Sequence, residues 1–414
     1  MSIRVIAMSD KLDEHKVERF LSRADELERK GDIDDAVRYY TAALYLDQEN
    51  NFIRRRLREL KRISFIKFFP RAIALVDDVS YDGKYLPLIF RNNRELIVLD
   101  IETGAEAFRL RGKMVSRAFW FPRTHYLGVA LRNGDVCVVD VGSGSMRRIF
   151  NVHDVASFKY ITSVTCSRDC SRVLIALDRE KLILVKNPLS KPEFVPIDEE
   201  IYCRAIYLRP DGEYVVVLGD EANYVFKLED GGQLLFIAQF MGRYGEAGSA
   251  IWNNSGTHLY MHYYDEIAVI NFEKLLEDIR SGRINELWDE YHRRFVDDRY
   301  FYNDCYIEAR LHIIDFLTED ENELALSGGG EISYHPGDYV VSPDDRYLAC
   351  TYGYTMIGIW DLERREVIYK WRMRKALIED DIEDLDILCE ISWLGNNKLV
   401  IVWLNAVAVL DLDL

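Results

Sequence analysis

Apolar and polar positions follow two different periods along the chain. From Lys16 to Ile63, apolar residues recur every three or four positions, which is the spacing of one face of a helix. From residue 64 to the end, short apolar or alternating runs are separated by polar turn residues, which is typical of β-strands. The pattern therefore predicts a small helical domain, residues 1–63, followed by a large β-rich domain, residues 64–414.

The break at Gly31-Asp32 divides the helical domain into two helices. Asp34 and Asp35 bring negative charge to the start of the second helix, where the helix dipole favours it. Small side chains would let the two helices approach closely: Ala24, Ala36 and Ala43. These features predict a helical hairpin.

This hairpin resembles a tetratricopeptide repeat, a helix-turn-helix unit of about 34 residues. The matching positions are Phe20, Ala24, Leu27, Gly31-Asp32, Ala36, Tyr40, Ala43, Leu44 and Leu46-Asp47. The chain departs from the family at Arg23, where Leu is usual, and at Gln48, where Pro is usual. Because such solenoids need about three repeats to bury a core, a single hairpin must pack on its own larger domain, a second copy or a foreign helix.

A third helical stretch carries Ile53, Leu57 and Leu60 on one stripe, and we expect it to cap the hairpin. Its remaining positions are rich in basic residues, from which we select candidate partner-binding residues: Arg54, Arg55, Arg58, Lys61 and Arg62. They could contact an acidic protein or the phosphates of a ribonucleoprotein. The alternative is a solvated helix face, or a contact with the acidic remainder of the chain.

A repeat runs through the β-rich domain and is clearest from Val341 to Leu362, VSPDDRYLACTYGYTMIGIWDL. This stretch holds a polar turn, two strand-like runs and a Trp-Asp pair. Weaker copies of the turn lie mostly about 40 to 50 residues apart, the period of four-stranded propeller blades. Their turn markers are Asp82-Gly83-Lys84, Pro122-Arg123-Thr124, Arg168-Asp169-Cys170, Pro210-Asp211-Gly212, Asn254-Ser255-Gly256, Pro343-Asp344-Asp345 and Gly395-Asn396-Asn397.

The repeat resembles that of WD40-type β-propellers. Apolar-Asp pairs close several copies: Leu99-Asp100, Val139-Asp140, Trp360-Asp361 and Leu410-Asp411. The Gly-His pair that often opens such repeats is missing, which puts the hydrogen-bonded His and Asp arrangement of the family in doubt. The fold class that we predict is mainly β: a seven-bladed β-propeller with a small N-terminal α-helical domain.

One interval between turn markers is irregular, because Ser255 and Asp344 are widely separated. A helical pattern within it, at about residues 272–297, predicts an insertion in one blade, with Leu287, Trp288 and Tyr291 on one stripe as a candidate partner-binding surface. Eight blades are the alternative, with Tyr306 to Leu317 and Glu323 to Ser327 supplying additional strands. The closing partner of the last strand should lie near Phe65 to Phe69, or near Ile3 to Ala7.

Charge and composition narrow the function classes. The net charge is -17, yet residues 1–63 carry 14 Lys and Arg against 13 Asp and Glu. The helical domain is therefore nearly neutral, whereas the β-rich domain is strongly acidic. The overall acidity argues against broad binding to nucleic acid. Seven scattered cysteines, no signal-like start and no apolar run of membrane-spanning length predict a cytoplasmic protein without a disulfide framework. Scarce Gln with abundant Arg, Asp and Glu is a bias found in proteins of thermophiles.

Catalytic motifs are sparse. The sequence has no P-loop, no H-E-x-x-H and no G-x-S-x-G, and its eight histidines are scattered. We therefore expect no catalytic residues, no metal and no cofactor. The sequence predicts a non-catalytic scaffold or adaptor that holds other proteins in a multi-subunit assembly, as both resembled families imply. The alternatives are a ribosome- or ribonucleoprotein-associated factor that binds through the basic helix, and a propeller enzyme or small-ligand binder with a site at the central channel.

Overall fold

The computed structural model describes residues 2–69, 73–76, 78–90, 94–197, 201–219, 223–240, 248–263, 266–281, 307–312, 336–352, 356–372, 388–403 and 405–414. The predicted stripe of Leu287, Trp288 and Tyr291 lies outside these residues, as does most of the segment 272–297. No helix among the described residues is long and apolar enough to cross a membrane.

Three helices precede the strands: α1 (Ser2–Arg29), α2 (Ile33–Leu46) and α3 (Asn51–Lys61). Asp32 caps α2 by accepting a hydrogen bond from Asp35 N–H, and Asn50 caps α3 by accepting one from Ile53 N–H. Because α1 begins at Ser2, the sequence from Ile3 to Ala7 is helical, and its expected role as a closing strand is wrong.

The described strands form seven four-stranded sheets, and five of these follow the order of the chain from β2 to β21. Their strands are β2 (Ile73–Val76), β3 (Tyr85–Phe90), β4 (Glu95–Asp100) and β5 (Glu106–Arg111); β6 (Val115–Trp120), β7 (Tyr126–Leu131), β8 (Asp135–Asp140) and β9 (Ser145–Asn151); β10 (Ile161–Cys166), β11 (Arg172–Leu177), β12 (Lys181–Lys186) and β13 (Glu193–Ile197); β14 (Ala205–Leu208), β15 (Tyr214–Leu218), β16 (Asn223–Leu228) and β17 (Leu234–Phe240); and β18 (Ser249–Trp252), β19 (His258–Tyr263), β20 (Glu266–Asn271) and β21 (Ile307–His312).

The two remaining sheets contain the C-terminal strands. One is β22 (Pro336–Val341), β23 (Tyr347–Tyr352), β24 (Met356–Asp361) and β25 (Glu366–Arg372). The other has the order β1-β28-β27-β26, from β1 (Ile63–Phe68), β26 (Leu388–Trp393), β27 (Lys398–Trp403) and β28 (Ala406–Asp411). Among the described residues, two short helices lie between strands: a 3-10 turn (Val152–Asp154) and α4 (Phe272–Arg280).

The sheet order confirms seven blades. Helix α4 follows β20, and the next described strand, β21, completes the same sheet. A helical insertion over residues 272–297 stays a prediction. Strand β21 covers part of Tyr306 to Leu317, so this stretch belongs to the fifth blade and not to an eighth. The last sheet closes through β1, which pairs antiparallel with β28 from Ile63 opposite Leu410 to Phe68 opposite Ala406.

Buried serines fix the turn that recurs between the first two strands of several blades. Ser80, Ser167 and Ser342 are at most 3% exposed. Each hydroxyl donates to the aspartate two residues later at 2.6 Å and accepts the backbone N–H of the residue that is five positions ahead. The turn markers that define the repeat in the sequence are therefore set by a buried side chain.

The Trp-Asp pair of the best-preserved repeat has a structural role. Trp360 is 1% exposed in the core, and the Asp361 carboxylate accepts the backbone N–H groups of Glu363 and Arg364 at 3.0 Å each. Burial alone would raise the pKa of Asp361, but these bonds and the Arg346 guanidinium outweigh it and lower the pKa. Asp361 thus holds its own turn together by local hydrogen bonds.

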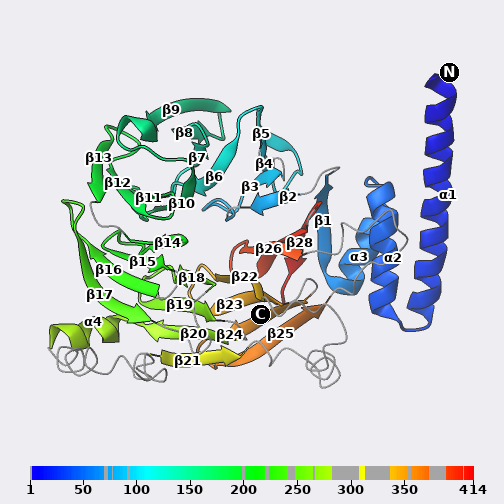
Figure 1. Ribbon diagram of the computed structural model, residues 1–414. Coiled ribbons are helices and arrows are strands. Elements are labelled where there is room, and N and C mark those ends of the chain that lie inside the picture. Colours follow the sequence, from blue (N-terminus) through cyan, green and yellow to red (C-terminus); the bar gives the residue numbers. More distant parts are fainter. Residues whose placement is uncertain are drawn as a thin grey trace. The chain divides into compact units, whose positions relative to one another are not determined.

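The described residues divide into two compact units: unit 1 comprises Met1–Val79, Asp100–Ala105 and Pro336–Leu414, and unit 2 comprises Ser80–Leu99 and Glu106–His335. In unit 1, one continuous apolar core joins the three helices to the last two sheets. Helix α3 buries Ile53 and Leu57 completely, and the ring of Tyr45 on α2 meets Phe68 on β1 edge-on at 5.6 Å. The hairpin therefore packs on its own chain, beside β1 (Figure 1).

Candidate functional site

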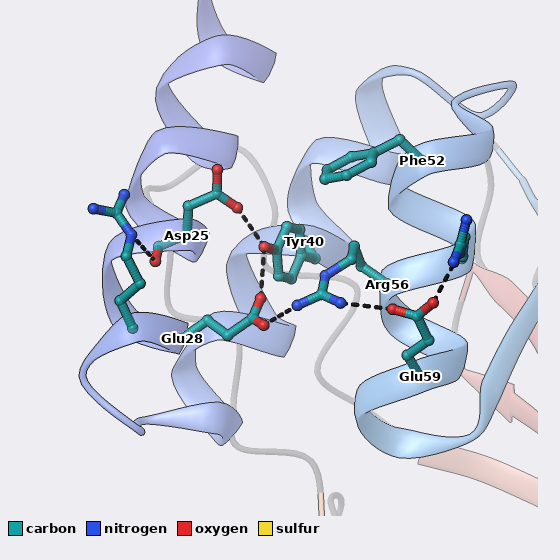
Figure 2. A pocket seen from close by; sticks show the side chains of 8 residues that line it. Asp25, Glu28, Tyr40, Phe52, Arg56 and Glu59 are labelled. Carbon is teal, nitrogen blue, oxygen red and sulfur yellow. Dashed lines mark hydrogen bonds and ion pairs between the residues drawn. The ribbon is translucent and has the colours of Figure 1, made fainter.

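A groove among the three N-terminal helices is the candidate functional site, and we call it the helical groove. It has a volume of about 440 Å³. Helix α1 contributes Asp25, Glu28 and Arg29; α2 contributes Tyr40; and α3 contributes Phe52, Arg55, Arg56 and Glu59 (Figure 2).

Tyr40 forms the floor of the helical groove. The residue is 0% exposed, and its hydroxyl oxygen lies 2.5 Å from Asp25 Oδ1 and 2.9 Å from Glu28 Oε2. Burial raises the pKa of the Tyr40 hydroxyl, and the hydrogen bond to Asp25 raises it further. A catalytic tyrosinate needs the opposite shift, so Tyr40 serves as a fixed hydrogen-bond donor between two carboxylates.

Arg56 links the wall of the groove on α1 to the wall on α3. Its guanidinium forms an ion pair with Glu28 and a second, at 2.6 Å, with Glu59 (Figure 2). Glu59 also accepts from Arg55 Nε at 2.8 Å. The hydrogen bonds from Arg55 and Arg56 lower the pKa of Glu59. Since three carboxylates and three guanidinium groups line the groove, its charges balance.

An aromatic ring stands at the rim. Phe52 is 55% exposed, although it lies one residue before the fully buried Ile53. Arg55 is a highly exposed charge of the groove, with 79% of its side chain accessible. Aromatic and arginine side chains are enriched in protein-protein contact sites, and both are exposed here beside a polar floor.

The five basic residues predicted as a site do not gather at one place in the structure. Only Arg55 lines the helical groove. Arg54 donates to the carbonyls of Gln48 and Phe65, and Arg58 donates to Ser64 Oγ at 3.1 Å. Lys61 pairs with Asp34 at 2.5 Å, and Arg62 pairs with Asp413. Most of this basic cluster therefore holds α3 to its surroundings.

Sequence reasoning missed several residues of the groove, above all Phe52, Arg56 and Tyr40. One signal was present in the sequence: Asp25 and Glu28 are three residues apart on one helix and so share a face. That face meets the position of Tyr40 once the hairpin is formed. Nothing in the sequence predicted that Phe52 is exposed, because an aromatic residue next to Ile53 is equally compatible with a position in the core.

Among the described residues, no group of three or more His, Cys, Asp or Glu side chains is arranged to hold a metal ion. Two carboxyl groups do come close in unit 1. Ser392 Oγ donates to Asp78 Oδ1 at 3.3 Å, and Asp338 Oδ2 accepts Ile391 N–H at 3.0 Å. Burial raises the pKa of Asp338 to about 7 despite the Ile391 hydrogen bond, and the neighbouring charge of Asp78 adds to the rise.

Neither a protein-family model nor a curated protein sequence matches the chain. Solved structures do match, and 1680 chains among them are similar to it. One is the crystal structure of the beta-propeller domain of Cps50 (Swd1) from Myceliophteria thermophila. It is 13% identical, with a TM-score of 0.56, and the match covers 84% of this chain and 99% of that one. At this low identity the match shows a shared fold alone. Together with the seven four-stranded sheets, the match establishes that this chain is a seven-bladed β-propeller.

Proposed function

We propose that this protein is a non-catalytic interaction scaffold in a multi-subunit assembly and that the helical groove is one of its partner-binding surfaces. The propeller fold supports this interpretation, because propellers are platforms whose roles lie on their loops and faces. The similar solved structure, that of Cps50 (Swd1), is likewise a beta-propeller domain. A cytoplasmic location and the resemblance to tetratricopeptide repeats stay predictions.

The main support for the proposal is that Phe52 is exposed on helices that are otherwise rigidly anchored. The apolar core of unit 1 fixes α2 and α3 on the β1 sheet, so the groove keeps its geometry without a partner. A preformed groove loses little conformational entropy on binding, and an exposed ring at its rim can supply apolar contact.

The test compares Phe52→Ala with Phe236→Ala, which removes a similarly exposed ring from β17 in unit 2. Each tagged full-length protein is purified from the native cell, and the co-purifying proteins are quantified by mass spectrometry. We expect Phe52→Ala to lose a defined subset of the wild-type partners and Phe236→Ala to retain that subset. Retention of every partner by the Phe52→Ala protein, folded as judged by an unchanged melting temperature, would contradict the proposal.

Binding to a ribonucleoprotein through α3 is the second candidate from the sequence. Its residues Arg54 and Arg58 make the internal hydrogen bonds described above, whereas the Arg55 side chain is 79% exposed. Such binding would weaken steeply with added salt and on neutralising Arg54, Arg55 and Arg58. Salt-independent binding would exclude it. The third candidate from the sequence, a propeller enzyme or small-ligand binder with a site at the central channel, stays a prediction.

A further inference from the structure

Two cysteines meet at a turn in unit 2. Cys166 ends β10, and Cys170 lies in the turn from Ser167 to Arg172, which leads into β11. The two thiols are hydrogen-bonded to each other, and both side chains pack against the same apolar cluster. Each residue is half-buried, so neither thiol is enclosed by the core.

Hydrogen bonds that do not involve sulfur fix the turn. Ser167 N–H donates to Arg172 O and Cys170 N–H donates to Ser167 O, each at 2.9 Å. The Asp169 carboxylate accepts from the Ser167 hydroxyl at 2.6 Å and from the Ser171 hydroxyl at 2.8 Å. The turn therefore holds the two thiols beside each other.

Cys170 occupies a backbone position that suits glycine. Its φ is 59°, in the left-handed region. Its counterparts in the turns before β3 and β15 are Gly83 and Gly212, whose N–H groups make the same bond to the residue three positions earlier. In the turn before β23 the counterpart is Asp345, and aspartate tolerates this conformation better than most residues. The backbone gives no reason for a cysteine here, whereas the contact of its thiol with Cys166 does.

The two thiols differ in acidity. The hydrogen bond with Cys166 lowers the pKa of the Cys170 thiol and outweighs burial and the nearby Asp169 carboxylate, which raise it. The same hydrogen bond, together with burial, raises the pKa of Cys166. Since the thiolate is the nucleophile in thiol chemistry, Cys170 is the attacking group and Cys166 is the thiol that stays protonated.

Three further cysteines among the described residues provide internal references. Cys137, Cys203 and Cys350 are buried, and burial raises the pKa of each thiol. Buried thiols in apolar surroundings are inert, because little thiolate forms and reagents do not reach it.

We propose that Cys166 and Cys170 form a reversible modification site, at which a hydroperoxide oxidises the two thiols to a disulfide. The contact of the two thiols, the fixed turn and the cysteine at a glycine position support this assignment together. The site goes beyond the proposed scaffold function and does not rest on it.

The oxidation takes two steps. The Cys170 thiolate attacks one oxygen of the hydroperoxide and breaks the O–O bond, which leaves a sulfenic acid on Cys170 and releases an alcohol, or water from hydrogen peroxide. The Cys166 sulfur then attacks the sulfenic sulfur and forms the S–S bond, while the displaced hydroxyl takes the Cys166 proton and leaves as water. In sum, two thiols and one hydroperoxide give one disulfide, one alcohol and one water. A dithiol restores both thiols by exchange.

Oxidation would change contacts between turns at one end of unit 2. Cys170 Sγ donates to Pro122 O, in the turn between β6 and β7, at 3.2 Å. Arg168, between the two cysteines, donates its backbone N–H to Pro210 O at 2.8 Å and Nη1 to Asn254 O at 2.9 Å. A disulfide removes the S–H donor and closes a covalent ring around Arg168, so it alters a turn that contacts three others.

The experiment uses the full-length protein, first reduced and then exposed to hydrogen peroxide. The remaining thiols are alkylated after denaturation, and a tryptic digest is analysed by mass spectrometry. Because Arg168 lies between the two cysteines, trypsin separates them into the peptides 160–168 and 169–172. A Cys166–Cys170 disulfide therefore appears as these two peptides linked to each other.

We expect the linked peptides to form at peroxide concentrations that leave Cys137, Cys203 and Cys350 fully alkylated. Their rate of formation should not depend on protein concentration, and dithiothreitol should remove them.

Two variants separate the roles of the thiols. Cys170→Gly should abolish the linked peptides, and its melting temperature should equal or exceed that of the reduced wild type, because glycine suits the backbone there. In Cys166→Ala, peroxide should leave a sulfenic acid on Cys170 that dimedone labels, whereas Cys166 in Cys170→Gly should stay unlabelled.

Three results would overturn the inference. The first is that Cys166 and Cys170 stay as fully alkylated as the three buried cysteines. The second is a linkage between two chains, seen as a rate that rises with protein concentration. The third is a zinc ion that the reduced wild type retains and Cys170→Gly loses, because the thiolates would then be metal ligands. Dimedone labelling of Cys166 in Cys170→Gly would contradict the assignment of Cys170 as the attacking thiol.

Discussion

Single polar side chains decide two properties of this protein: buried serines hold the repeating turns, and the half-buried Asp338 titrates near neutral pH. The polar turn Ser342-Pro343-Asp344-Asp345 was recognisable in the sequence, but the organising role of Ser342 within it was not. Its importance comes from complete burial, since a buried hydroxyl must satisfy its hydrogen bonds. Burial depends on the second strand folding over the turn, which no local pattern reports.

Ser342→Ala should therefore destabilise the protein by about 1–2 kcal/mol, because Tyr347 N–H loses its acceptor in the interior. Urea unfolding followed by tryptophan fluorescence measures the effect. Ser143→Ala is the control, since that hydroxyl lies in an exposed turn and bonds Ser145. An equal, negligible change in both variants would show that the buried serine does not hold the turn.

Asp338 makes stability depend on pH in a defined direction. Its folded pKa is about 7 and its ordinary value is 3.8, so the folded state binds a proton that the unfolded state has lost between these values. Stability from this group is therefore present below about pH 4 and falls as pH rises through about 7.

The melting temperature of Asp338→Asn should accordingly vary less between about pH 5 and pH 8 than that of the wild type, with the largest gain at pH 8. Asp154→Asn, at an exposed position, provides the comparison. Parallel pH profiles for the wild type and Asp338→Asn would contradict the raised pKa.

At the scale of elements, the sequence predicted the N-terminal helices, but it left the partners of the basic residues on α3 open, and their role in partner binding stays a prediction. A count of arginines shows charge and cannot show pairing, because the partners lie far away in sequence: Asp34 for Lys61, and Asp413 for Arg62. The apolar stripe was more reliable, since Ile53 and Leu57 are completely buried. Apolar periodicity fixes which face of a helix is covered, whereas exposed charge leaves its partners open.

Helix α3 connects the N-terminal helices to the sheets of unit 1. Shortening the apolar side chains on its buried face should therefore weaken the packing of the helices on the sheets. Ile53→Ala should cost about 2–5 kcal/mol, because it opens a cavity in the shared core of unit 1. Leu60→Ala, at a partly buried position on the same helix, should cost clearly less. Urea unfolding gives the two free energies, and limited proteolysis shows whether the helices are cleaved first. If both variants lost equal stability, α3 would not be the anchor.

For the whole molecule, repeat spacing was sufficient to predict the propeller and its seven blades. The irregular interval remained ambiguous in the sequence because a strand of an added blade and the last strand of an interrupted blade have the same pattern. Pairing of β21 with β20 settles it. The sequence also left two candidates for the strand that closes the last blade. Strand β1 takes this place, whereas Ile3 to Ala7 lies within helix α1.

The shared core also changes how the scaffold can be tested. Deleting residues 1–63 would remove the start of β1 and the Tyr45 ring that packs on Phe68, so lost binding would not separate a lost surface from lost folding. Point variants at exposed positions avoid this. Phe52 and Arg55 are the suitable pair because both line the helical groove and both are exposed.

The most direct measurement is the Kd for one of the co-purifying partners, determined with purified proteins by isothermal titration calorimetry. Three proteins are compared: the wild type, the groove variant Phe52→Ala/Arg55→Glu, and the control Phe236→Ala. We predict that the groove variant binds that partner about tenfold or more weakly, while Phe236→Ala binds as the wild type does. Equal Kd values for all three proteins would contradict the claim that the helical groove is a partner-binding surface of a scaffold.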